Sequence, residues 1–182
     1  VFSDGRQKAA RLAAELGRSA LRDSARPMLL RGFQELRAKQ APRGLEATYL
    51  ALLLGAQSLG VDLRTTDEVQ DSTVRAHAEL AAELVQSNFN RALESEFQGQ
   101  QPPRPVATMV LQLIRDRHVG IQSLGLAKIV PNPELELLYR KNVLAKVSLG
   151  KLDEPGKRAL INLWLALLLE RHGCGLYPAD WL

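Results

Sequence analysis

Apolar residues recur at the spacing of an α-helix in one segment after another, and Gly or Pro stands between the segments. The clearest segment is LEATYLALLLGAQSLG, which ends near Gly60. A period of 3.6 residues places such side chains on one face of a helix. Aromatic residues make up only 5% of the chain, which also favours helix over strand. The sequence therefore predicts an irregular all-α fold of about seven to nine helices, with one possible strand remnant at the N-terminus.

Local start and stop signals place the first helices. Apolar residues at helical spacing predict a helix from Gly5 to about Gly17. Asp23 or Ser24 can cap a second helix, and QAPRG at 40–44 breaks it. The inner face of this second helix is predicted to hold Met28, Leu29, Phe33 and Leu36.

The next helical stretch starts at DEVQ and runs to about Gln98, with Thr65 or Thr66 as its cap. It is either continuous or divided into two helices near Ser87 and Asn88. The side chains expected to face inward are Val69, Val74, Leu80, Leu84, Phe89, Leu93 and Phe97.

Proline and cap residues organise the second half. QGQQPPRP at 98–105 predicts a loop, and Pro105 suits the start of the helix VATMVLQLIRDRH. GIQSLGLA predicts a short helix or turn, and KIVPNP is extended and is the one place where a short strand is allowed. Asn132 begins the helix ELELLYRKNVLA, and Asp153 caps a last long helix over about 154–171.

The longest apolar run is LINLWLALLL at 160–169, within the last predicted helix. It is too short to span a bilayer, so it predicts a buried helix with Trp164 in the core. The single cysteine, Cys174, excludes an internal disulfide framework and fits a reducing compartment. We therefore expect a cytoplasmic protein.

Positive charge is concentrated at the start of the chain. Residues 1–43 carry 10 Lys or Arg against 4 Asp or Glu, whereas residues 44–182 carry 14 against 16. A basic segment can contact phosphate, but it can equally be a solvated helix face. We treat 1–43 as one part and 44–182 as a helical domain that packs with it as one unit.

The opening stretch, VFSDGRQKAARLA, has the form of a strand that runs into a basic helix. Unpaired N–H groups at a helix N-terminus form an anion site when a strand precedes them. The alternative from the residues alone is a capped surface helix with ordinary charges. Because two apolar residues stand before the polar hinge Ser3-Asp4-Gly5, we expect the chain to be a piece of a larger protein.

The same stretch resembles motif IV of superfamily 2 nucleic-acid helicases, and more narrowly the large bacterial DEAD/DEAH-type helicases of the MrfA-like and phage-defence groups. That motif opens the second RecA-like lobe and commonly reads (V/A)FSDsRQdAA. The matching residues are Phe2, Ser3, Asp4, Arg6, Gln7, Ala9 and Ala10. Gly5 and Lys8 depart from the usual residues. The resemblance is strong over about 13 residues and weak through about residue 37, so the rest of the chain lies outside it.

The resemblance implies a part of an ATP-dependent helicase or translocase in phage defence or DNA repair. It implies a nucleic-acid phosphate contact in this part of the chain, and the following 140 or so residues would form a helical insertion. The chain contains no ATP-binding P-loop, so ATP and magnesium would bind elsewhere in the parent protein. Partners would be single-stranded or junction nucleic acid, the other helicase domains and a possible partner subunit. The nucleic-acid-binding residues expected in the opening stretch are Ser3, Asp4, Arg6, Gln7, Lys8 and Arg11.

A second hypothesis is an all-α protein–protein interaction module without a nucleic-acid role, in which the basic first quarter is solvated surface. Its discriminating feature would be the chain before Val1. A strand-rich lobe with a P-loop would favour the helicase, and a start Met just before Val1 would oppose it.

Three further residues form a possible secondary nucleic-acid contact, namely Arg115, Arg117 and His118. Cations at a helix C-terminus are also favoured for structural reasons. His77 lies in a mostly polar helix and is expected at the surface. We predict no metal site. Zinc needs about four ligands, whereas His172 and Cys174 have no second Cys beside them and the other His residues are distant. No catalytic residues are predicted.

Overall fold

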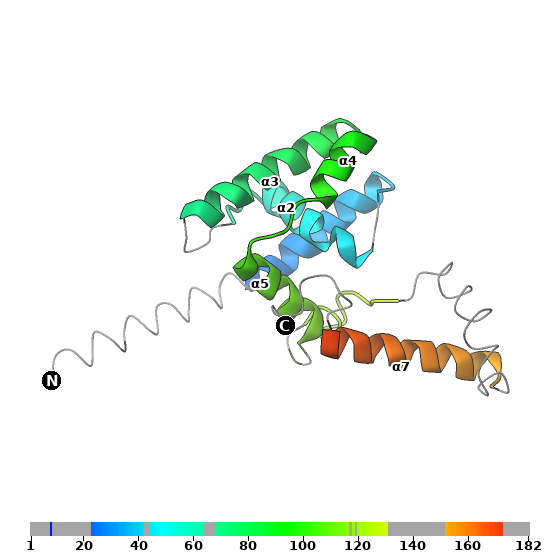
Figure 1. The fold of residues 1–182 in the computed structure, drawn as a ribbon. Coiled ribbons are helices and arrows are strands. Elements are labelled where there is room, and N and C mark those ends of the chain that lie inside the picture. The colour runs from blue at the N-terminus through cyan, green and yellow to red at the C-terminus, as the bar shows by residue number, and fades with distance from the viewer. Residues whose placement is uncertain are drawn as a thin grey trace. The chain divides into compact units, whose positions relative to one another are not determined.

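The computed structural model describes residues 8, 23–41, 44–63, 68–116, 118, 120–130 and 152–172 (Figure 1). Within these ranges the regular elements are helices and there is no strand, which confirms the all-α prediction. The predicted strand remnant at Val1 and Phe2, the Thr65 or Thr66 cap and the helix after Asn132 lie outside the described residues. The same holds for the first predicted helix, apart from Lys8, which is helical and exposed.

The chain divides into two compact units, Val1–Leu113 and Ile114–Leu182. The predicted boundary after residue 43 stays a prediction. In the first unit, residues 23–38 are helical and Met28, Leu29 and Leu36 are fully buried, as the spacing predicted. Phe33 is only half-buried. The predicted break follows, with Gln40 at a φ of 56° and the Ala41 N–H donating to the carbonyl of Leu36.

The helix over residues 23–38 crosses α2 (Thr48–Leu59) at very short range. A Cβ atom built on Gly32 would overlap the carbonyl oxygen of Ala51, and one on Gly55 would overlap that of Met28. The two backbones are therefore in direct contact at two points, and only glycine fits at each. At the edge of the crossing, Nε of Arg31 donates to Oγ of Ser58 over 2.9 Å.

The 3-10 helix η1 (Leu45–Ala47) leads into α2, which is buried along most of its length. The run of buried residues reaches Ala56, so this helix is the centre of the unit's core. The helix ends where predicted, because Gly60 adopts the left-handed conformation at a φ of 65°.

The long helical stretch is divided in two, which confirms the second of the two alternatives (Figure 1). Helix α3 (Glu68–Gln86) packs on α2, and α4 (Arg91–Gln98) packs on α3. Asn88 and Phe89 both have positive φ, and the Phe89 N–H donates to the carbonyl of Leu84 over 2.9 Å. The side chain of Asn90 then accepts from the N–H of Ala92 and caps α4.

The inward positions of α3 and α4 are only partly as expected. Val74, Leu84 and Phe97 are buried, while Leu80, Phe89 and Leu93 are half-buried. The prediction that Val69 faces inward is wrong, because its side chain is 74% exposed in the first turn of α3. The loop before α5 (Arg104–Arg115) and the start of that helix at Arg104-Pro105 agree with the prediction. The buried apolar residues of α5 are Val106, Ala107, Met109, Val110, Leu111, Leu113 and Ile114.

In the second unit, residues 120–126 form turns, and residues 127–130 have no regular structure. The extended segment therefore forms no strand over its described residues, 128–130. The last helix, α7 (Glu154–His172), starts at the predicted cap, because Oδ1 of Asp153 accepts from the N–H of Gly156 over 2.9 Å. Its apolar run at 160–169 predicted a buried helix, and this is wrong for several of the side chains that the structure describes, which are those of residues 160–167.

Of the large apolar residues of α7 whose side chains are described, Ile161 is buried at 5% exposure. Trp164 is 48% exposed and lies outside the core, and Leu163 and Leu167 beside it are also exposed. Apolar content indicated burial, but the number of surfaces packed against a helix decides it. None of the described helices is both long enough and apolar enough to cross a membrane.

Candidate functional site

Most of the predicted phosphate-contacting residues belong to the part of the chain that the structure does not describe. Ser3, Asp4, Arg6, Gln7 and Arg11 lie outside the described residues. Lys8 is the exception, with an exposed side chain on a helical backbone. A lysine at the surface of a helix can contact a phosphate.

The secondary contact falls at the end of α5 and in the turn that follows. Arg115 is half-buried, His118 is exposed, and Arg117 is outside the described residues. Asp116 organises this turn, because its Oδ1 accepts from the His118 N–H over 2.8 Å and its carbonyl accepts from Oγ of Ser123 over 2.6 Å. The carboxylate next to the cations reduces the local positive charge that a phosphate would meet.

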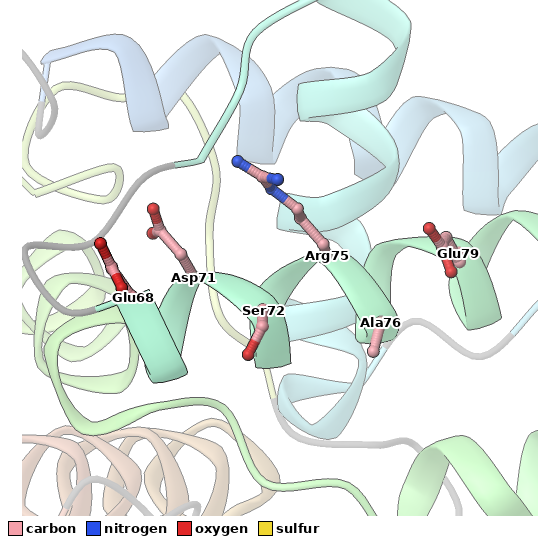
Figure 2. Close-up of a pocket in the computed structure, with 6 residues that line it drawn as sticks. All are labelled: Glu68, Asp71, Ser72, Arg75, Ala76 and Glu79. Carbon is pink, nitrogen blue, oxygen red and sulfur yellow. The ribbon is translucent and has the colours of Figure 1, made fainter.

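A shallow depression lies along one face of α3 (Figure 2). Its described lining comes from that single helix, and three of its four charged residues are acidic: Glu68, Asp71, Ser72, Arg75, Ala76 and Glu79. The spacing of these residues is that of one helical stripe. Three carboxylates against one guanidinium disfavour phosphate, and within the described residues no group of His, Cys, Asp and Glu could hold a metal ion.

The expectation that His77 is a surface residue is wrong. His77 is 7% exposed, and its Nδ1 lies 2.9 Å from the hydroxyl of Tyr49, which is 4% exposed. The Tyr49 ring meets the imidazole edge to face at a centroid distance of 5.8 Å and stacks on Phe97 at 6.0 Å. We call Tyr49, His77 and Phe97 the aromatic cluster. It joins α2, α3 and α4, because each contributes one ring.

Burial lowers the pKa of His77 below its ordinary value of 6.5, while a hydrogen bond with the side chain of Gln100 opposes part of this effect. A signal for the burial was present in the sequence. Val74, His77, Ala81 and Leu84 are the buried residues of α3, and their spacing of three, four and three residues defines one helix face. Treating the imidazole as apolar would have placed His77 on that face.

Comparison with protein-family models, with curated proteins and with solved structures finds no match to this chain.

Proposed function

We propose that this chain is part of an ATP-dependent nucleic-acid helicase or translocase, in bacterial phage defence or DNA repair. It would contribute a phosphate-backbone contact and a helical accessory domain. The observation that carries the proposal is the opening stretch VFSDGRQKAARLA, with its likeness to helicase motif IV. Two features support it. The excess positive charge lies in residues 1–43, and the described part of the chain is helical rather than an alternation of strands and helices.

The proposed contact is electrostatic and independent of base sequence. Ser3 would donate a hydroxyl hydrogen bond and Arg6 a forked pair of N–H groups to the phosphate oxygens. Asp4 and Gln7 would hold the loop, and Lys8 and Arg11 would add positive charge along the helix. Arg115, Arg117 and His118 would form a second contact. ATP and magnesium would be bound by other parts of the parent protein, and movement along the strand would come from there.

The test is the salt dependence of binding of a labelled single strand to the chain, comparing wild type with the double variant Ser3→Ala and Arg6→Ala. Each lost phosphate contact lowers the slope of log Kd against log salt by about 0.7 on single strands. We therefore expect weaker binding and a shallower slope for the double variant. The measurement is fluorescence anisotropy over a salt series.

The matched control is Ser95→Ala with Arg91→Ala, because both residues are exposed on α4 and the loss of charge is the same. Binding that weakens equally in both double variants would mean that only net charge matters. Binding that is unchanged in the Ser3 and Arg6 variant, or absent in wild type at low salt, would contradict the phosphate contact.

A second candidate function is an all-α interaction module without a nucleic-acid role. It is favoured by the exposed apolar side chains of α7, with Leu163, Trp164 and Leu167 within one turn of each other. Sedimentation velocity of the wild-type chain against Leu163→Gln with Leu167→Gln tests a second copy as the partner. Concentration-dependent association that the double variant abolishes would support this function, and a wild-type monomer would exclude a second copy as the partner.

A further inference from the structure

The aromatic cluster puts a titratable group where three helices meet. His77 of α3 and Tyr49 of α2 are both more than nine-tenths buried, and their polar atoms are 2.9 Å apart. Phe97 of α4 is also buried and stacks on Tyr49. The side chain of Gln57 adds a second link from α2 to α3, because its Nε2 donates to the carbonyl of Ala78 over 2.6 Å. Buried groups of α2 and α4 therefore meet at the imidazole of α3, and a hydrogen bond beside it also links α2 to α3.

The neutral imidazole suits this position. It offers one acceptor nitrogen and one N–H donor. With the proton on Nε2, Nδ1 is free to accept the hydroxyl proton of Tyr49. Protonation would turn Nδ1 into a donor, so the tyrosine hydroxyl would have to rotate and find another acceptor. It would also place a positive charge among the buried rings. This costs free energy, because a charge at this position is removed from the water that would otherwise hydrate it.

Among the described residues of α2, α3 and α4, few charged groups are placed to stabilise that positive charge. Helix α2 contains no Asp, Glu, Lys or Arg, so Tyr49 is its titratable group at the cluster. One turn from His77 along α3, the residues are Thr73, Val74, Leu80 and Ala81. Arg75 and Glu79 of α3 are exposed and lie two residues away, which directs them to other faces of the helix.

On α4, the residue one turn before Phe97 is Glu94, which is half-buried and accepts from Nε2 of Gln98. After α4, Gln100 is neutral. Protonated His77 would therefore have hydrogen-bonding groups beside it but, among these neighbours, no carboxylate that pairs with it.

We propose that His77 is an acid-sensitive latch, whose protonation releases α3 and α4 from α2 in the first unit. The proposal is independent of the nucleic-acid function. Because burial lowers the pKa of His77 in the folded protein, the unfolded chain binds more protons than the folded chain between the folded pKa and the ordinary value of 6.5. The stability that neutral His77 contributes is therefore fully present above the unfolded pKa. This contribution falls as the pH decreases from there toward the folded pKa. A latch of this kind responds between neutral and mildly acidic conditions.

The experiment follows the full chain by NMR titration of the histidine side chains and by amide hydrogen exchange at about pH 7.5 and about pH 5.5. Exchange rates are corrected for their intrinsic pH dependence. We expect His77 to titrate below its ordinary value. We also expect the amides of α3 and α4 to lose protection on acidification, more than those of residues 23–38. The variants are His77→Gln, which cannot be protonated, and His118→Gln, which removes an exposed histidine.

His118→Gln should retain the acid-induced loss of protection, and His77→Gln should lose it. The latch is overturned if His77 titrates at or above its ordinary value, or if His77→Gln opens with acid as wild type does. If His77→Gln fails to fold at neutral pH, the titration and the exchange of the wild-type chain decide by themselves. An acid-induced loss of amide protection that is equal in residues 23–38 and in α3 and α4 would also contradict a latch at this position.

Discussion

At the scale of single residues, two glycines set the closest packing in the first unit. Gly32 and Gly55 bring the helix over residues 23–38 and α2 into backbone contact at two points. Glycine inside a helix costs about 0.5–1 kcal/mol relative to alanine. The close approach of the two helices is the gain that offsets this cost, because apolar groups on either side can then pack without a gap.

Replacing Gly55 by alanine should destabilise the first unit. The new Cβ would overlap the carbonyl oxygen of Met28, so the two helices would have to separate. Overpacking of this kind costs about 1–3 kcal/mol of unfolding free energy. Urea titration of wild type and variant measures this loss. Gly99→Ala is the control, because Gly99 has a φ of −73° and a Cβ there would meet no atom closer than 3.4 Å. An equal loss in both variants would show that the crossing is not tight.

At the scale of elements, local signals set the helix ends. Gly60 ends α2, and Asp153 and Asn90 supply the caps of α7 and α4. These interactions need only a few neighbouring residues, which is why the sequence predicted the Gly60 and Asp153 positions. Asn90 was not predicted as a cap, although the division near Ser87 and Asn88 was one of the two alternatives.

Helix α4 should be sensitive to the loss of its cap, because it has only eight residues. Asn90→Ala removes the acceptor for the Ala92 N–H and should cost about 0.5–2 kcal/mol. Asn90→Asp keeps an acceptor and should remain close to wild type. The measurement is the hydrogen-exchange protection of the α4 amides in each variant. Equal protection in wild type and Asn90→Ala would show that tertiary packing, rather than the cap, holds α4.

At the scale of the whole molecule, charge is unevenly distributed. The first 43 residues carry the excess of positive charge, while the remaining residues are slightly acidic. The acidic stripe on α3 that includes Glu68, Asp71 and Glu79 belongs to this second part. A polyanion would therefore meet attraction at one part of the sequence and repulsion at another.

The secondary contact gives a prediction at this scale. If the turn after α5 touches nucleic acid, Arg117→Ala with His118→Ala should weaken binding a few-fold and flatten the salt slope further. Anisotropy measurements in the Ser3 and Arg6 double-variant background test whether the two effects add. We take Arg75→Ala with Gln70→Ala on α3 as the comparison. Unchanged binding in the Arg117 and His118 variant would remove these residues from the interface.

The sequence by itself determined the helical class and many helix boundaries, because periodicity, caps, glycine and proline act over a few residues. The burial of single side chains was decided only by the tertiary structure. His77 is buried because Tyr49 and Phe97 arrive from other helices, and Trp164 is exposed despite its apolar neighbours. A helix pattern states which faces are apolar, but burial depends on what packs against each face, and that information is spread over distant parts of the chain.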